Sequence, residues 1–436
     1  MSAKNTLPTR RATHAGSWYT ANPRVLGKEL QSWLDSVPDQ VSDILTEQPD
    51  QEQQYEAKDK LQTEENDKGD SHIHAIIVPH AGYTYCGRTA AYSYKALDIS
   101  KYSRIILLGP SHHVYLDDCA ISGCGSLETP FGKLAVDVDE IARLKRRARF
   151  STLRVKQEED EHSLEMLMPF LHYVFGAAKE NTTHLKTNHP SDSSGNNVRD
   201  GAQSQGEHGT TLDSTNGLLT NKAYSSAAKS AAKNSSSYLL ENKLKVIPII
   251  VGNLDREAEA YYGKVLSEYL NDEDSSGGEP SRTLFAISSD FCHWGTRFQY
   301  TFYSPSETEN PSSDFTFLDP RITSRDELVN YQKHLKTVPI HTSIKNLDYE
   351  AIAAIKSLDP AQFASYLDTT ENTICGRHPI MVLLEAVAYT STRKKSLPST
   401  KDSSFRVDFV DYSQSSKCLS VKDSSVSYAA GILYKS

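Results

Sequence analysis

Short apolar runs alternate along this chain with segments in which apolar residues recur every three or four positions. The apolar runs predict strands at 75–79, 104–109, 118–122, 245–251, 283–288, 405–411 and 426–434. The segments with helical spacing predict helices at 23–35, 87–97, 137–147, 163–175, 255–270, 348–356, 360–367 and 378–390. Such alternation favours a sheet covered by helices, and the two adjacent C-terminal strands suggest an antiparallel portion. We therefore expect an α/β fold with a central mixed β-sheet flanked by helices.

Four polar segments interrupt this pattern. Residues 36–70 are rich in Asp, Glu and Gln, and residues 177–237 are rich in Ser, Asn, Thr, Lys and Gly. Shorter polar stretches span 304–342, where we expect an extended loop with a short helix, and 392–404. Such compositions bury too little apolar surface to offset chain entropy, so they predict disordered insertions. Without them roughly 290 residues remain, which predicts that residues 1–436 form a single domain with long polar insertions.

Composition excludes several classes of function. The net charge is −9, from 47 basic and 56 acidic residues, and no long basic run occurs, which disfavours a nucleic-acid partner. No apolar stretch approaches the roughly 18 residues that suggest a membrane-spanning helix. Residues 1–11 lack the apolar core of a secretory signal. We expect a soluble cytoplasmic protein, with the nucleus as a second location.

The six cysteines do not form a recognisable zinc or disulfide pattern. There is no CxxC pair, and Cys119 and Cys124, five residues apart, have no second pair to complete a zinc site. Because disulfides are rare in intracellular proteins, we interpret these two as small buried thiols. Cys375 differs from them because it lies in a polar, glycine-containing stretch, Ile374-Cys375-Gly376-Arg377-His378-Pro379.

Three predicted strands end at a metal-capable residue close to a glycine. His80 follows the run 75–78, His112 and His113 follow the run 104–108, and Asp290, Cys292 and His293 follow the run 284–287. Open α/β sheets place their sites beyond the carboxyl ends of strands, so we expect these side chains to converge in one cleft. For His80, a hydrogen-bonded structural role is an equal alternative.

Neighbouring candidates constrain one another. His112 and His113 are adjacent, so on an extended segment they point to opposite faces and at most one enters the cleft. Asp290 and His293 are three apart and could share a face if a helical turn begins there. The acidic stretch 160–166 precedes an apolar helical pattern, and we interpret it as a helix cap rather than a metal site. HExxH, GxGxxG, P-loop and GxSxG motifs are absent from the chain.

Taken together, seven segments closely resemble the Memo family, whose name stands for mediator of receptor-tyrosine-kinase-driven cell motility. The segments occur in family order and span nearly the whole chain. They are 14–19 (HAGSWY), 79–87 (PHAGYTYCG), 109–114 (GPSHHV), 161–166 (EHSLEM), 288–295 (SSDFCHWG), 372–379 (NTICGRHP) and 423–431. The polar segments look like additions to the compact animal form, which points to a fungal-type member.

The resemblance implies a fold similar to the class III extradiol non-haem iron dioxygenases. It implies a pocket that holds one copper or iron ion per chain through His80, His112 and Cys375. Asp290 and His293 would lie beside that pocket, and Trp18 would line its vestibule as part of a phosphotyrosine-peptide site. The family is linked to redox and metal balance, to cell motility and, in fungi, to invasive growth.

A thiolate ligand changes the expected chemistry. Extradiol enzymes bind iron through two histidines and a carboxylate, whereas Cys375 supplies a softer ligand that favours Cu(I) or a more covalent iron site. Three functions follow: a redox-active metal protein, a peptide-binding scaffold on a vestigial metalloenzyme fold, and, as the least favoured, an extradiol-type dioxygenase. In the first, His293 is the expected base, Asp290 an orienting group or weak fourth ligand, and Arg377 could lower the pKa of the thiol.

Overall fold

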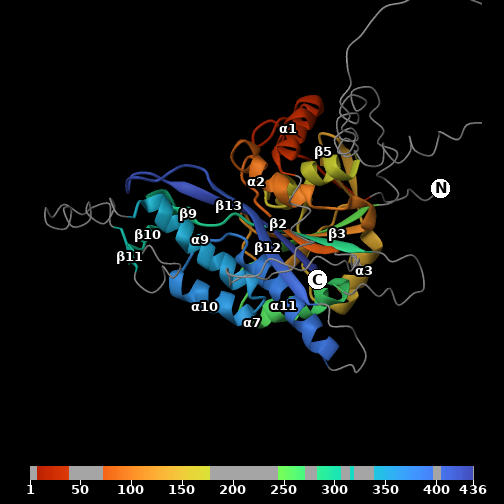
Figure 1. Ribbon diagram of the computed structural model, residues 1–436. Coiled ribbons are helices and arrows are strands. Elements are labelled where there is room, and N and C mark those ends of the chain that lie inside the picture. Colours follow the sequence, from red (N-terminus) through yellow and green to blue (C-terminus); the bar gives the residue numbers. More distant parts are fainter. Residues whose placement is uncertain are drawn as a thin grey trace, which may run out of the picture.

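A mixed, 11-stranded β-sheet forms the centre of the protein (Figure 1). The computed structural model describes residues 7–38, 72–176, 244–270, 282–305, 315–318, 338–395 and 404–435. The strand order is β1-β5-β6-β7-β3-β8-β2-β13-β12, with β4 paired to β7 and β9 paired to β13. These strands are β1 (Thr9–Arg10), β2 (Ile73–Val78), β3 (Arg104–Pro110), β4 (Cys119–Ile121), β5 (Ser126–Thr129), β6 (Gly132–Val136), β7 (Lys245–Val251), β8 (Thr283–Ser288), β9 (His293–Trp294), β12 (Phe405–Gln414) and β13 (Ser425–Lys435).

The middle of the sheet is parallel, and antiparallel pairs flank it on both sides, β5 with β6 on one and β13 with β2 on the other. β6, β7, β3, β8 and β2 run parallel, while β13 pairs antiparallel with both β2 and β12. Every residue of β2 and β8 is buried. Strands of this kind need cover on both faces, which is why they read as continuous apolar runs rather than alternating ones. The predicted mixed sheet is therefore confirmed.

Helices cover both faces of the sheet (Figure 1). The α-helices of the described residues include α1 (Pro23–Ser36), α2 (Tyr83–Lys95), α3 (Val138–Arg147), α4 (Val155–Asp160), α7 (Arg256–Leu266), α9 (Ile340–Lys356), α10 (Pro360–Thr370) and α11 (Arg377–Lys395). α2 packs on β2 and β13 and carries α1, whereas α11 packs on β3 and β8 and carries α7. Among the described helices, none is long and apolar enough to cross a bilayer.

Some boundaries differ from the sequence predictions. α9 begins at Ile340 rather than at 348, and the expected helix 163–175 starts as a 3-10 turn, η4 (Glu165–Leu167), before its α-helical part at 168–176. β1, β5, β6, β9 and α4 are additional elements that the apolar patterns did not predict. Their short length, two to six residues, leaves too few positions for a period to be recognised.

The predicted insertions fall mostly outside the described residues. This holds for almost all of 36–70, for 177–237, and for much of 304–342 and 392–404. Where 304–342 is described, Thr316–Phe317 forms a strand, β11, that pairs with β10 (Phe302–Tyr303), and the first turn of α9 begins at Ile340. Of the predicted insertion 392–404, residues 392–395 continue α11, and Thr392 Oγ1 donates to the carbonyl of Ala388.

A buried carboxyl group connects α9 to the segment that follows β8, to the loop that follows α10, and to β12. Asp348 is fully buried in α9, and its Oδ1 accepts hydrogen bonds from the Cys292 amide (3.2 Å) and from Asn372 Nδ2 (3.2 Å). Its Oδ2 accepts from the Tyr412 hydroxyl (2.9 Å). Burial raises the pKa of this carboxyl to about 6, although these hydrogen bonds oppose the shift.

We expect Asp348→Asn to remove part of the pH dependence of stability. In the unfolded chain an aspartate titrates near pH 4, so between about pH 4 and 6 the folded state binds more protons and its stability falls as pH rises. At about 1.4 kcal/mol per pKa unit, the free energy of unfolding of the wild type should fall relative to the variant on the order of 3 kcal/mol. Urea unfolding of both proteins from pH 4 to 7 measures this difference, and a pH-independent difference would contradict the assignment.

Candidate metal centre

Three neighbouring parallel strands deliver the predicted residues to one edge of the sheet. β2 ends two residues before His80, β3 ends two residues before His112, and β8 ends two residues before Asp290. Because β3, β8 and β2 are adjacent and parallel, their carboxyl ends lie side by side. Cys375 reaches the same edge from the loop between α10 and α11.

One ring nitrogen of His80 faces Cys375, and the other is hydrogen-bonded to Ser288. Its Nε2 lies 3.2 Å from Cys375 Sγ, and its Nδ1 lies 2.6 Å from Ser288 Oγ. The Ser288 hydroxyl donates its proton to the carbonyl of Ser163 (2.6 Å), so Ser288 accepts from the Nδ1–H of His80. Burial lowers the pKa of His80 well below its ordinary value, with the neighbouring histidines adding to the effect. The ring is therefore neutral, with a lone pair on Nε2.

A carboxylate orients His112 in the same way as Ser288 orients His80, with Nδ1 as the donor. Its Nδ1 lies 2.9 Å from Glu161 Oε1, and its backbone amide donates to Glu161 Oε2 (2.6 Å). Burial alone would raise the pKa of Glu161, but hydrogen bonds from His112 and Ser163 lower it to about 2. An ionised carboxylate only accepts, so the His112 Nδ1–H donates and Nε2 is left for another partner. Carboxylate–histidine pairs of this type commonly orient metal ligands.

Cys375 completes the set. The residue as a whole is partly exposed, and its Sγ accepts a hydrogen bond from the backbone amide of Asp290 (3.2 Å). Burial, and next the charge of Asp290, raise the pKa of the thiol well above its ordinary value. Arg377 does lower this pKa, as expected, but its effect is smaller than those of burial and of Asp290, so the net shift is upward. Its guanidinium also donates to Asn253 Oδ1 (3.3 Å). Thiolate formation here requires a stronger cation than arginine, and a metal ion is one.

The three side chains offer a donor set that suits a transition metal. One donor atom each from His80, His112 and Cys375 lie within 4.8 Å of one another. A second group, His112, Glu161 and His162, satisfies the same distance, but there the His112–Glu161 contact is already an internal hydrogen bond. Two imidazole nitrogens and one sulfur are ligands that copper, iron and zinc accept. The chemistry of this donor set therefore fits a metal ion.

Asp290 and His293 border the centre in ways that the sequence pattern only partly predicts. No helical turn joins them, because His293 begins β9, which pairs with β13. Asp290 is buried and its Oδ1 accepts from the backbone amide of His80 (2.8 Å), while burial raises its pKa to about 7. His293 Nδ1 lies 2.9 Å from the carbonyl of Phe291 and 3.2 Å from that of Thr373. Since carbonyls only accept, Nδ1 carries the proton and Nε2 carries the lone pair.

Comparison with known proteins decides the family. The family model described as Memo-like protein matches residues 10–183 and 236–432. Protein MEMO1 of Mus musculus is 33% identical over 429 residues, 98% of each chain, and Protein MEMO1 of Xenopus laevis is 34% identical over 424 residues, 97% of each chain. Protein memo-1 homolog of Caenorhabditis elegans is 31% identical over 426 residues, 98% of this chain and 83% of that protein. The chain belongs to the Memo family.

The family assignment agrees with the observed architecture. A central mixed sheet flanked by helices is the fold expected for a Memo protein, which is similar to that of the extradiol dioxygenases. The family match leaves residues 184–235 of this Memo protein unmatched, and these lie within the polar segment 177–237.

Trp18 contacts the centre through His162, a histidine that the sequence pattern did not mark as a candidate site residue. The Trp18 ring is 4.4 Å from the ring of His162, and His162 stacks at 4.4 Å on His112. Burial lowers the pKa of His162 to about 3, so this ring is neutral. His112 and His113 are both exposed, but of the two only His112 has a ring nitrogen close to the donor atoms of His80 and Cys375. The His113 ring lies 6.0 Å from that of His162.

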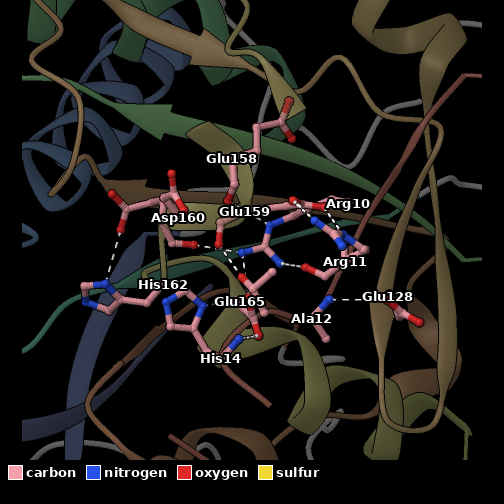
Figure 2. A network of polar contacts seen from close by, with 12 residues as sticks. Arg10, Arg11, Ala12, His14, Glu128, Glu158, Glu159, Asp160, His162 and Glu165 are labelled. Atoms are coloured by element: carbon pink, nitrogen blue, oxygen red, sulfur yellow. Dashed lines mark hydrogen bonds and ion pairs between the residues drawn. The ribbon is translucent and has the colours of Figure 1, made fainter. Parts of the chain in front are cut away.

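The capping interpretation of residues 160–166 is wrong for this Memo protein. No side-chain cap is formed at η4. Glu161 accepts locally from the amide of Ser163 (3.0 Å), but two of the acids, Glu161 and Glu165, also bind distant residues. Glu161 orients His112, and Glu165 accepts hydrogen bonds from the backbone and ring of His14 (Figure 2). A carboxylate at a helix start that contacts the chain 151 residues away looks, in the sequence, the same as a local cap.

Proposed function

We propose that this Memo protein binds one redox-active metal ion, copper or iron, through His80 Nε2, His112 Nε2 and Cys375 Sγ. The observation that carries the proposal is that Ser288 and Glu161 occupy the opposite nitrogens of the two rings, so that both lone pairs remain for an ion. A thiolate in the set favours Cu(I) or a covalent iron site over the hard ions magnesium and calcium.

A bound copper or iron ion would supply one-electron chemistry, and the surrounding residues would manage protons. We assign His293 as the base, because its Nδ1–H is held by two backbone carbonyls and its Nε2 is available to take or give a proton. Asp290 would act as an orienting group, since it fixes the backbone of His80 and its amide donates to Cys375 Sγ.

Family membership supports a role in redox and metal homeostasis and in cell motility or invasive growth signalling, in the cytoplasm and the nucleus. A peptide-binding scaffold is the second candidate. It is favoured by Trp18, a partly exposed aromatic ring beside the centre, which would contact a phosphotyrosine peptide or a signalling protein. An extradiol-type dioxygenase is the least supported function, because Cys375 replaces the carboxylate that such enzymes use.

Oxygen consumption separates the redox protein from the scaffold. Copper- or iron-loaded wild type is expected to consume oxygen with ascorbate as electron donor, whereas His80→Ala treated in the same way should match the protein-free rate. Equal rates for both proteins would contradict the redox proposal. In that case, binding of a phosphotyrosine peptide followed by Trp18 fluorescence, with Trp18→Phe as the comparison, would test the scaffold.

A further inference from the structure

A buried ion pair lies behind the candidate metal centre. Arg10 in β1 and Glu165 in η4 are 3% and 0% exposed, and Arg10 Nη2 lies 2.7 Å from Glu165 Oε2 (Figure 2). Removing two charges from water is costly, and buried pairs are often no more stabilising than apolar residues of similar size. The other hydrogen bonds of the two side chains therefore indicate what the pair does.

Arg10 uses its remaining donors to hold the segment that carries Glu161. Its Nε donates to the carbonyl of Glu158 (3.0 Å), and its Nη2 donates to the carbonyl of Glu161 (2.8 Å). The backbone of Glu161 is thereby fixed to the guanidinium, and the carboxylate of the same residue accepts the Nδ1–H of His112. One hydrogen-bonded path thus runs from Arg10 to a candidate ligand.

Glu165 holds a second segment, at the amino terminus. Its Oε1 accepts from the His14 amide (2.9 Å) and the Tyr19 hydroxyl (2.7 Å), and its Oε2 lies 2.9 Å from His14 Nδ1. Trp18 lies between these two anchors in the chain. Its ring packs on His162, which in turn stacks on His112. A second path, made of ring contacts, therefore ends at the same imidazole.

We propose that Arg10 and Glu165 are positioning residues that set the orientation of the His112 imidazole, through Glu161 on one side and through Trp18 and His162 on the other. This inference rests on the proposed metal site. Arginine suits the task because its planar fork serves the carboxylate and three backbone carbonyls at once, those of Glu158, Glu161 and Arg11. A lysine ammonium on a flexible stem cannot do this with the same geometry.

The neighbouring pair provides a matched control. Arg11 and Glu159 form a side-chain contact of the same type, with Arg11 Nε 2.8 Å from Glu159 Oε1. Arg11 is 69% exposed, and its guanidinium bonds to Glu159. Its backbone carbonyl accepts from Arg10 Nη1 (2.8 Å), a contact that Arg11→Lys retains because the backbone is unchanged. Arg11→Lys therefore changes the same chemical group, one residue away, outside the proposed path.

The test uses Co²⁺ as a spectroscopic probe added to the metal-free full chain of the wild type, Arg10→Lys and Arg11→Lys. We expect Arg10→Lys to bind Co²⁺ about 10- to 100-fold more weakly, with shifted ligand-field and sulfur-to-cobalt bands, because a ligand has lost its orientation. Arg11→Lys should match the wild type. A shift of the bands at saturating Co²⁺ would not follow from lower stability alone. Wild-type affinity and bands in Arg10→Lys would overturn the inference.

A second variant covers the case in which Arg10→Lys does not fold. Replacing both partners, Arg10→Met with Glu165→Met, removes the buried charges together and leaves no lone ion in the core. This double variant should show the same weakened binding and altered bands, and wild-type values would overturn the inference.

If wild type and His80→Ala bind Co²⁺ alike, the proposed metal site itself fails. If only Arg10 and Glu165 prove neutral, the site stands and their positioning role fails.

Discussion

His80→Ala and Cys375→Ser are each expected to reduce the metal content of the purified protein from one ion per chain to background. Each variant removes one of three donor atoms that lie within 4.8 Å of one another. The loss should exceed the roughly 10- to 100-fold reduction in affinity that is typical of residues that only orient a ligand. Elemental analysis of proteins purified without chelators measures it directly.

The fold of both variants should remain cooperative. In His80→Ala the Ser288 hydroxyl keeps its hydrogen bond to the carbonyl of Ser163, so no buried donor is left unpaired there. Suitable controls are His113→Ala, an exposed histidine beside the centre, and Cys124→Ser, a buried thiol elsewhere. If His80→Ala and Cys375→Ser both retain the metal content of these controls, the ligand assignment must be discarded.

Gly376→Ala should damage both stability and metal binding. A Cβ at this position would lie 2.3 Å from Ser289 Cβ and 2.5 Å from the carbonyl oxygen of Ser288, far inside any normal contact. The end of β8 and the loop that carries Cys375 must then separate. Overpacking of this kind typically costs about 1–3 kcal/mol. Because Ser288 also holds the His80 ring, separation moves two of the three donors at once.

Urea unfolding and metal titration of Gly376→Ala measure the two effects. Gly82→Ala is the matched control, since it also follows a candidate ligand closely. There the nearest atom to a new Cβ is the Trp18 carbonyl oxygen at 3.5 Å, an ordinary contact, and φ is −55°. Gly82→Ala should therefore be close to wild type. A Gly376→Ala protein with wild-type stability and metal content would show that the loop accommodates the methyl group without moving Cys375.

The central strands of the sheet were predictable because strands buried on both faces are continuous apolar runs in the sequence. β2, β3, β7 and β8 are covered on both faces, so almost every residue in them is apolar. The start of α9 was also within reach, since Ile340, Ile344 and Leu347 are fully buried at helical spacing. It was missed because the preceding polar segment, 304–342, was extended over the first turn of the helix.

The candidate ligands divide into two kinds. His80, His112 and Asp290 follow parallel strands, so the general rule that sites lie at the carboxyl ends of strands was enough to select them. Cys375 follows no strand. It entered the candidate set only through the resemblance to the Memo family, and its 3.2 Å contact with His80 joins residues 295 positions apart.

The periodicity of apolar residues established a helix-covered sheet and the strand edge at which the candidate residues gather. It did so because backbone period and burial act locally, within a few residues. The roles of Glu161, His162, Glu165 and Arg10 depend instead on contacts between segments separated by 49 to 155 residues. No local pattern distinguishes a carboxylate that caps its own helix from one that orients a distant histidine, so these roles became visible only when the folded chain brought the segments together.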